Sequence, residues 1–208
     1  MIQWTIDAAL DSGRFEYVLV STDDMEIAEV AIAAGAHVPF LRTQHADDYA
    51  PVSQAVCAAL DQSEAFWRVC FDQVVQLMPN CPLRTGHDIE QAMHRFETTG
   101  AEFQISVFRY GWMNPWWALR LNPDQTAEPL FPEASRRRSQ DLPELYCPTG
   151  AIWIARSDSL RRVGTFYGPG YTVAEMPWHS AVDIDEPADL RMAEMLMLMG
   201  QDGPVAGV

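Results

Sequence analysis

The stretch Tyr17-Val18-Leu19-Val20-Ser21-Thr22-Asp23-Asp24 holds the pattern that decides the fold of this 208-residue chain. Four apolar residues in a row predict a buried strand, and the short polar residues that follow are typical of a helix N-cap. A helical pattern then continues to Ala34 and is closed by Gly35. Because a buried strand leading directly into a helix is the repeating unit of parallel sheets, this stretch predicts an α/β fold.

The same alternation continues on both sides of this stretch. Residues 1–11 have a helical pattern that ends at Ser12-Gly13. Further strands are predicted at residues 37–41, 69–78, 103–108, 150–155 and 171–177, and further helices at residues 52–64, 86–98, 158–163 and 187–199. We expect a single domain over residues 1–200 and a disordered tail over residues 201–208.

The alternation is interrupted over residues 109–148. This segment holds Trp112, Trp116 and Trp117, several prolines and the basic triplet Arg136-Arg137-Arg138, but no helical pattern long enough for a crossover. Such an aromatic-rich excursion favours an arm that packs on a second subunit. The alternative is a long loop folded back on its own domain.

The composition excludes several functions. The net charge is −15, and all 14 basic residues are arginine. The absence of lysine excludes a Schiff-base lysine and a lysine-bearing phosphate loop, and it argues against a nucleic-acid surface. No signal-peptide pattern and no apolar run of membrane-spanning length occur, so we expect no membrane association. The four cysteines show no C-x-x-C spacing, which favours a reduced, cytoplasmic setting.

Two carboxylates flank one apolar residue in Asp183-Ile184-Asp185, which we expect at the end of a strand and just before a helix that begins near Pro187. Side chains alternate along a strand, so both carboxylates face the same way if Ile184 faces the core. Two acidic groups beyond the carboxyl end of a strand suit a hard cation such as Mg²⁺. The alternative is a helix N-terminus with Asp185 as its cap.

Five motifs in register resemble those of the CMP-sialic acid synthetases, the acylneuraminate cytidylyltransferases. They are Val20-Ser21-Thr22-Asp23-Asp24 with Glu26-Ile27-Ala28, Pro39-Phe40-Leu41-Arg42, Pro79-Asn80-Cys81-Pro82-Leu83-Arg84, Gly150-Ala151-Ile152-Trp153 and Asp183-Ile184-Asp185. The resemblance extends to about residue 197. It implies a Rossmann-like, mostly parallel sheet of the nucleotide-diphospho-sugar transferase type, with a dimerisation arm and hence a homodimer. It also implies Mg²⁺-dependent transfer of CMP from CTP to a nonulosonic (sialic-type) acid, with release of pyrophosphate.

Asn80, Arg84, Arg42 and Ser53 are the candidates for binding the anionic substrates. Asn80 and Arg84 follow the predicted strand that ends at Met78, where a planar guanidinium is expected to bind the sugar carboxylate in a bidentate manner. The alternative for Arg84 is solvent contact ahead of a helix. The resemblance implies nucleotide contacts for Arg42 and Ser53, and the alternative for Arg42 is a surface ion pair.

The resemblance also implies that Asp183 and Asp185 bind the catalytic metal and that Tyr146 and Thr149 contact the sugar. Met78 stands where many sialic acid enzymes have a glutamine that helps to bind the sugar. Because methionine cannot replace the hydrogen bonds of that glutamine, we expect a sugar that differs from common sialic acid.

The identity of the sugar and the activity of the chain stay open at this point. Residues 138–144 resemble a stretch of relatives that activate bacterial nonulosonates such as pseudaminic or legionaminic acid, but the residues after Gly150 are not those we associate with pseudaminic acid enzymes. In the family, a strand and a glycine-rich loop precede the position of Met1-Ile2. We therefore expect a longer native protein, a catalytically defective relative that dimerises or binds nucleotide, or a piece completed by another polypeptide. A cytidylyltransferase for the eight-carbon keto-deoxy acid of lipopolysaccharide is a further alternative.

Overall fold

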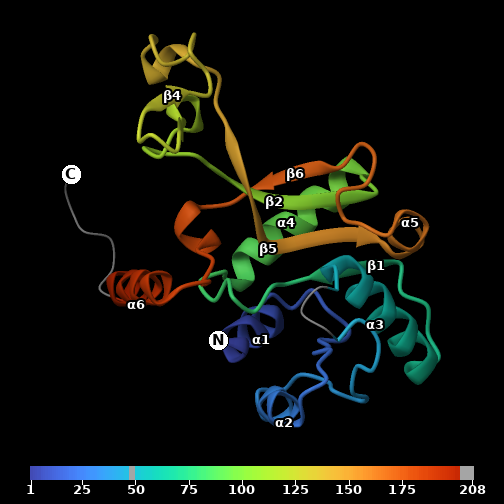
Figure 1. Ribbon diagram of the computed structural model, residues 1–208. Helices are drawn as coiled ribbons and strands as arrows, with labels where there is room; N and C mark the ends of the chain where they lie inside the picture. Colours follow the sequence, from blue (N-terminus) through green and yellow to red (C-terminus); the bar gives the residue numbers. More distant parts are fainter. Residues whose placement is uncertain (47–49, 202–208) are drawn as a thin grey trace.

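The central sheet has four strands in the order β1-β5-β2-β6 in the computed structural model, which describes residues 1–46 and 50–201. The strands are β1 (Gln73–Gln76), β2 (Phe103–Arg109), β5 (Tyr146–Arg156) and β6 (Thr172–Glu175). β6 is parallel to β2, whereas β5 is antiparallel to both β1 and β2. The carboxyl ends of β1, β2 and β6 therefore meet the amino end of β5 at one edge of the sheet, from which the arm extends (Figure 1).

Three of the four strands, β1, β2 and β6, run in the same direction, as predicted, and only β5 runs against them, so the described sheet is mixed. The chain leaves the carboxyl end of β2, forms the arm and returns to the same edge, so β5 runs back along its neighbours. β5 also begins at Tyr146, earlier than the predicted strand at residues 150–155. The α/β fold is confirmed, and its sheet is mixed.

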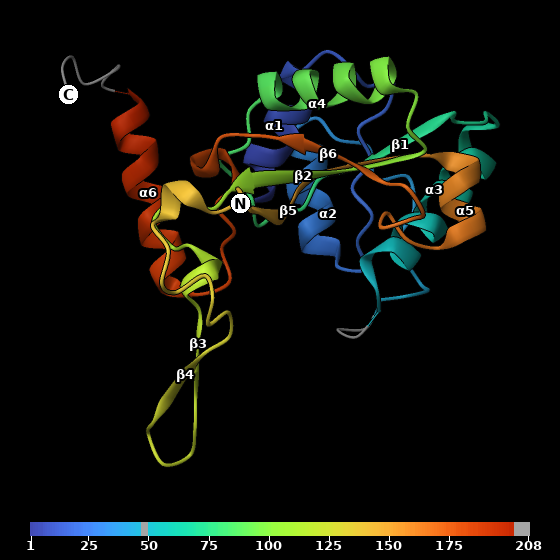
Figure 2. The same ribbon diagram turned by 90° about the horizontal axis from the view of Figure 1, so that it is seen from above.

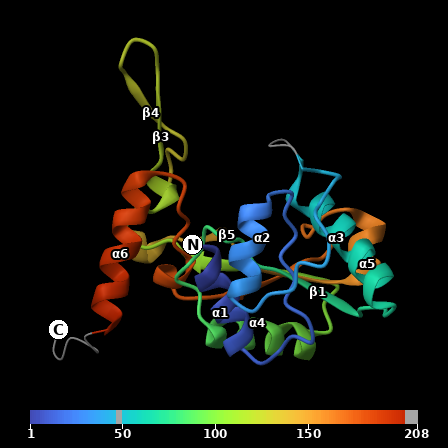
Figure 3. The ribbon, with the colours of Figure 1, turned by 90° about the horizontal axis from the view of Figure 1, so that it is seen from below.

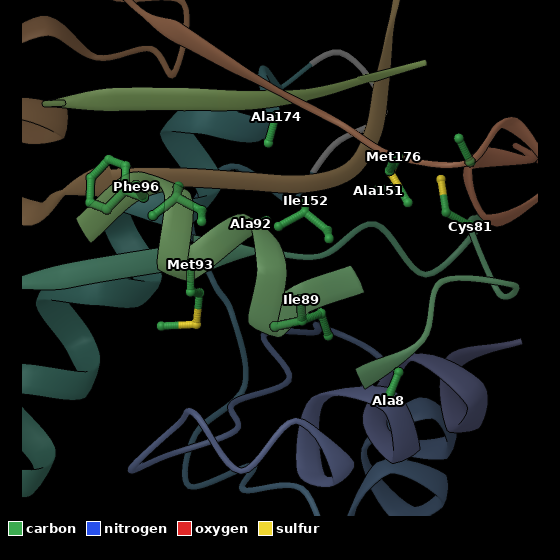
Figure 4. Packing of buried hydrophobic residues seen from close by; sticks show 12 residues of the cluster. Ala8, Cys81, Ile89, Ala92, Met93, Phe96, Ala151, Ile152, Ala174 and Met176 are labelled. Carbon is green, nitrogen blue, oxygen red and sulfur yellow. The ribbon is translucent and has the colours of Figure 1, made fainter. Parts of the chain in front are cut away.

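Helices cover both faces of this sheet (Figure 2). The helices are α1 (Ile2–Asp11), α2 (Met25–Ala33), α3 (Val52–Trp67), α4 (Gly86–Thr99), α5 (Ser157–Val163) and α6 (Pro187–Gln201). On one face, Ile89, Ala92 and Phe96 of α4 pack with Ile152 of β5 (Figure 4). On the other face, α5 contributes Leu160 to a cluster with the buried residues of β2.

The helix boundaries follow the predicted ones because local signals set them. The Asp24 carboxylate accepts hydrogen bonds from Glu26 N at 2.7 Å and from Ile27 N at 3.1 Å at the start of α2. Thr85 and Asp88 form a reciprocal capping box at the start of α4, which ends at Gly100 with φ of 65°. None of the described helices is long and apolar enough to cross a bilayer.

The predicted strands at residues 17–20 and 37–41 are wrong. In the described part of the chain, the two segments share a single parallel bridge between Leu19 and His37. His37 N donates to Val18 O at 2.8 Å, and Val20 N donates to His37 O at 3.0 Å. A strand needs a continuous series of such hydrogen bonds with its neighbour, and here the two segments share one bridge. Both segments pack with α1 and α2 around a small separate core of Ile6, Ala31 and Ala36. In this part of the molecule α2 lies beside α1 (Figure 3).

The arm projects away from the sheet in all three views (Figures 1, 2 and 3). It contains η1 (Pro115–Trp117), the antiparallel hairpin of β3 (Leu119–Leu121) and β4 (Ala127–Pro129), and η2 (Ser139–Asp141). At its base the Trp116 ring packs edge-on against Phe131, and Trp116 Nε1 donates to Pro143 O at 2.9 Å. Trp112 and Leu121 are exposed to solvent. The alternative of a loop folded back on its own domain is therefore not observed.

After β6 the chain passes through η3 (Trp178–Ala181) before it reaches α6. The acidic pair at residues 183–185 thus lies in a loop between η3 and α6, and not at the end of a strand as predicted. Pro177 accounts for the early end of β6, because proline lacks the N–H that would extend the ladder. Of the predicted tail at residues 201–208, residues 202–208 lie outside the described residues.

Candidate functional site

The loop that precedes α6 is joined to the loop that follows β1. Ile184 N donates to Asn80 O at 2.9 Å, and Asn80 Nδ2 donates to Asp185 Oδ1 at 3.5 Å. Both loops lie at the edge of the sheet where the parallel strands end. The structure therefore brings together Asn80, Asp183 and Asp185, although 103 residues separate the first two in the sequence.

The Asp183 carboxylate lies in an electrostatically unfavourable position. Partial burial raises its pKa, and the negative charges of Asp185 and Asp189 raise it further. The Cys81 thiol lies 3.7 Å from Asp183 Oδ1 and acts as a weak donor. Burial, followed by the charge of Asp183, raises the pKa of Cys81 to about 11, so this thiol is protonated at neutral pH. A cation bound at Asp183 would relieve the repulsion between the carboxylates.

The donor atoms of this group fit a hard cation. Asp183 and Asp185 supply carboxylate oxygens, which suit Mg²⁺ better than a softer metal. Within the described ranges, no group of three or more His, Cys, Asp and Glu side chains is arranged to hold a metal ion, so further ligands would have to come from main-chain groups, water or the substrate phosphates. The Asn80 amide turns its Nδ2 toward Asp185, and its buried Oδ1 accepts no hydrogen bond from a described residue.

A bulge in β5 places Thr149 beside this group. Ile105 pairs with Trp153, but the next residue of β2, Ser106, pairs with Thr149, so three residues of β5 are looped out. Ser106 Oγ fills the bulge by donating to Thr149 O at 3.0 Å and accepting from Ile152 N at 2.9 Å. At position 150 a Cβ would lie 2.7 Å from Met78 Cγ, so a larger residue than glycine would need the Met78 side chain to shift.

Thr149 is buried and its hydroxyl is engaged within the protein. Thr149 Oγ1 accepts from Ala151 N at 3.2 Å and lies 3.5 Å from Ala181 O, to which it donates. It thus ties β5 to the end of η3, just before the acidic loop. In this arrangement Thr149 holds Ala181 in position, and its predicted contact with the sugar stays a prediction.

Arg84 is buried in the interior. The sequence had predicted either a ligand of the sugar carboxylate or a residue in contact with solvent. Its side chain is 2% exposed, and its Nη1 donates to Ala151 O at 2.6 Å and to Met78 O at 3.3 Å. Its Nε and Nη2 have no hydrogen-bond partner among the described residues. Burial lowers the pKa of Arg84 to about 10. The guanidinium therefore joins β1 to β5 beneath the site and is not open to an arriving sugar carboxylate.

Arg42 and Ser53 lie in the N-terminal part of the molecule. The Arg42 guanidinium forms an ion pair with Asp23 at 3.6 Å, and Arg42 N donates to Thr22 O at 2.7 Å. The alternative of an ion pair is thus observed for Arg42. Ser53 is buried in the first turn of α3. Across the described residues, neither side chain hydrogen-bonds to the group at Asp183.

Tyr146 lies at the base of the arm together with Arg109, a residue that was not predicted from the sequence. Tyr146 Oη donates to Glu144 Oε2 at 3.4 Å, and Arg109 forms ion pairs with Glu144 at 2.9 Å and Glu175 at 3.8 Å. Arg109 also borders an open hollow of about 220 Å³ at the base of the arm. Its position as the last residue of β2 was the available signal, because ligands bind beyond the carboxyl ends of parallel strands.

Comparisons with known proteins show the family of this chain. A family model described as cytidylyltransferase matches residues 1–109. The chain is similar to pseudaminic acid cytidylyltransferase of Campylobacter jejuni subsp. jejuni serotype O:23/36 (strain 81-176), with 30% identity over 94% of this chain and 84% of the relative. It is also similar to CMP-N,N'-diacetyllegionaminic acid synthase of Legionella pneumophila subsp. pneumophila (strain Philadelphia 1), with 32% identity over 99% of this chain and 88% of the relative.

The fold is also that of a solved structure. The structure of CMP:2-keto-3-deoxy-manno-octonic acid synthetase complexed with CTP superposes with a TM-score of 0.63 at 17% identity, over 97% of this chain and 88% of that chain. At this identity the likeness shows the fold alone.

Proposed function

The chain belongs to the cytidylyltransferase family that includes the CMP-nonulosonic acid synthetases, and from this premise we propose that it transfers CMP from CTP to a nonulosonic acid. In this reaction the anomeric hydroxyl of the sugar acid attacks the α-phosphorus of CTP. The bond between the α-phosphorus and its bridging oxygen breaks, the hydroxyl proton is released, and pyrophosphate leaves. The observation that carries the proposal is the meeting of Asn80, Asp183 and Asp185 beyond the strand ends.

Asp183 and Asp185 are the residues that would hold Mg²⁺. When bound, Mg²⁺ neutralises charge on the phosphates and withdraws electrons from the reacting phosphorus. The contribution of the chain is to keep the two carboxylates fixed. The hydrogen bond between Ile184 N and Asn80 O holds their loop to the sheet, and Asp189 Oδ2 accepts from Glu186 N at 2.8 Å on the other side. This fixed geometry supplies the preorganisation that phosphoryl transfer needs.

Arg84 has a positioning role in this proposal. Through Met78 O and Ala151 O it fixes the loop that follows β1, which carries Asn80, against β5. A buried positive charge also favours the approach of anions to the surface above it. Its predicted role as a direct ligand of the sugar carboxylate would require the guanidinium to leave both carbonyl groups.

On the nucleotide side, we assign Arg42 and Ser53 to CTP. Arg42 is half-buried and its Nε has no hydrogen-bond partner in the described residues, so a phosphate could replace Asp23 as its anionic partner. On the sugar side, Tyr146 is the exposed candidate at the base of the arm.

A homodimer in the cytoplasm completes the proposal. The exposed faces of the arm and of α6 carry large apolar side chains that a second copy could cover: Trp112, Met113, Leu119, Leu121, Leu190, Met192, Met195 and Leu198. All four cysteines are free thiols, which suits a reduced compartment. Deleting residues 112–138 should give a monomer in sizing experiments. A dimer that survives the deletion would refute the role of the arm.

The reaction is tested by measuring pyrophosphate release with CTP and Mg²⁺ on a panel of sugar acids. We expect release with pseudaminic or legionaminic acid, weaker release with N-acetylneuraminic acid, and none with UTP in place of CTP. Release with the eight-carbon keto-deoxy acid alone would move the chain to that substrate class. If CTP binds but no acid is turned over, the chain is a nucleotide-binding protein without transferase activity.

A further inference from the structure

Gln76, the last residue of β1, carries a buried polar oxygen. The residue is 9% exposed, and its Oε1 is shielded from solvent and accepts no hydrogen bond from any residue in the described ranges. An unpaired buried carbonyl of this kind costs free energy on folding. Because buried polar groups in native proteins nearly always have a partner, the unpaired oxygen of Gln76 points to a hydrogen-bond donor that binds here.

Strand pairing places the Gln76 side chain next to Trp153 of β5. The two residues are cross-strand partners, so their side chains lie on the same face of the sheet. This is the face covered by α5, because Trp153 and Val74, two residues before Gln76, both pack in the cluster that contains Leu160. The Trp153 ring lies 5.5 Å, between ring centroids, from Tyr167, which is exposed. The amide of Gln76 therefore lies beside aromatic rings that lead from the core to the surface.

The Trp153 ring also connects Gln76 to the candidate site. Trp153 Nε1 donates to Thr149 O at 2.8 Å, and the Thr149 hydroxyl donates to Ala181 O just before the acidic loop. Gln76 itself ends its strand at the edge where ligands bind in open α/β sheets. Through Trp153, the unpaired amide is thus joined to Thr149, for which a contact with the sugar was predicted.

A second buried glutamine of the sheet has a structural function instead. Gln104 in β2 is 1% exposed, and its Nε2 donates to Ala92 O of α4 at 2.7 Å. Its Oε1 is also unpaired, but its nitrogen ties the helix to the sheet. The side chain of Gln76 makes no hydrogen bond to a described residue. Packing within the chain therefore accounts for the amide of Gln104 and not for that of Gln76.

We propose that Gln76 is a specificity-determining residue for the sugar acid, with its Oε1 accepting a hydrogen bond from a hydroxyl or an acylamino N–H of that substrate. The inference rests on the proposed function, which supplies the sugar acid. The ligand group must be a donor, because an amide oxygen offers only lone pairs. A related acid that lacks this donor would leave the buried oxygen unpaired in the complex, which is how such a site rejects close analogues.

The test compares Gln76→Met with the wild type in two measurements on the full chain. Methionine keeps the length of the side chain and removes the amide. Calorimetric titration with pseudaminic, N,N'-diacetyllegionaminic and N-acetylneuraminic acid, with CTP present and Mg²⁺ left out, measures binding without turnover. For the acid that the wild type binds most tightly, we expect affinity to fall by about 10-fold and the affinity for CTP to stay the same.

The second measurement is urea denaturation, and Gln104→Met is the matched control for both. Gln76→Met should be at least as stable as the wild type, because a buried unpaired oxygen is removed. Gln104→Met should be less stable, because Ala92 O loses its donor, and its affinity for the sugar acid should be unchanged. A structural role for Gln76 would make the two variants behave alike.

The outcomes separate this inference from the proposed function. Unchanged affinity for the sugar acid in Gln76→Met would overturn the role of Gln76, whether or not the chain is an active transferase. A Gln76→Met chain that is less stable than the wild type, or that binds CTP as weakly as it binds the acid, would also overturn it. If the wild type binds none of the three acids, the inference and the proposed reaction both fail. Weaker binding of the acid alone, in a chain without CMP transfer, would support the role of Gln76 and reject the reaction.

Discussion

The two regions predicted to bind substrate are held in place very differently. The acidic loop before α6 is bonded to the loop after β1, and both rest on the largest buried cluster of the molecule. The region around Arg42 has a small core of its own and a single bridge between Leu19 and His37. The difference teaches that a motif becomes a defined site only where a sheet and its core fix the surrounding loops. We expect substitutions in the first region to have larger effects than those in the second.

The largest effect should come from Asp185→Asn. Turnover dependent on Mg²⁺ should fall roughly a thousandfold, because several kcal/mol of charge stabilisation are lost with one ligand while the size of the side chain is kept. The measurement is the rate of pyrophosphate release, with Asp124→Asn in the arm as the matched control. Activity close to that of the wild type would remove Asp185 from the metal site.

The next largest effect should be the loss of stability in Arg84→Ala. Two main-chain carbonyls, Met78 O and Ala151 O, lose their donor and a cavity forms in the interior, so the free energy of unfolding should fall by about 3 kcal/mol. Urea denaturation measures this change. Arg42→Ala provides the contrast and should change the same quantity by less than about 1 kcal/mol. Equal changes for the two variants would break the comparison between the regions.

A smaller effect is expected from Arg42→Ala on catalysis. The KM for CTP should rise about 10-fold with kcat nearly unchanged, because one charged contact to the nucleotide is lost in both the ground state and the transition state. Asp23→Asn sharpens this test. It releases Arg42 from its ion pair, so the KM for CTP should stay the same or fall. A rise in the KM for CTP in Asp23→Asn would mean that the ion pair itself is needed.

The smallest effect should be the change in stability of Asp183→Asn with pH. The pKa of Asp183 is raised in the folded chain, so the folded state binds the proton more tightly than the unfolded state. Stability contributed by this group is therefore lost as the pH rises above its unfolded value, and it stays lost at pH 7. Without metal, Asp183→Asn should melt higher than the wild type at pH 7, by no more than about 3 °C because solvent screens this exposed carboxylate.

Two conditions check this last expectation by thermal unfolding. At pH 3 the two proteins should melt at nearly the same temperature, because Asp183 is then protonated. At pH 7 with Mg²⁺, the wild type should gain stability and Asp183→Asn should gain little. A lower melting temperature for Asp183→Asn at pH 7 without metal would show that the carboxylate is not under repulsion.

The elements that could be predicted from the sequence are those with local causes. Asp24 and Thr85 begin their helices through hydrogen bonds to residues only two or three positions further along the sequence. The acidic pair at residues 183–185 was also visible as a pattern. Its surroundings were not, because the loop that carries it follows a short 3-10 helix and not a strand.

The errors concern contacts between distant parts of the chain. The apolar run at residues 17–20 has the composition of a strand, but it becomes one only if a neighbour supplies a full ladder of hydrogen bonds. Arginine is usually a surface or ligand-binding residue, yet Arg84 is buried, where the main-chain carbonyls of Met78, just after β1, and of Ala151 in β5 accept its hydrogen bonds. Neither the missing strand at residues 17–20 nor the burial of Arg84 can be predicted from the neighbouring residues alone.

By itself, then, the sequence determined the α/β class, the caps of the helices, the absence of lysine chemistry and the two carboxylates that form the candidate metal site. Only the tertiary structure decided that β5 runs antiparallel, that Arg84 lies inside, and that Asn80 joins Asp183 and Asp185. The physical reason is the range of the interactions. Helix caps and side-chain patterns act over a few residues. Strand pairing, burial of a cation and the meeting of two loops depend on groups about 40 to 100 residues apart that only the packed sheet brings together.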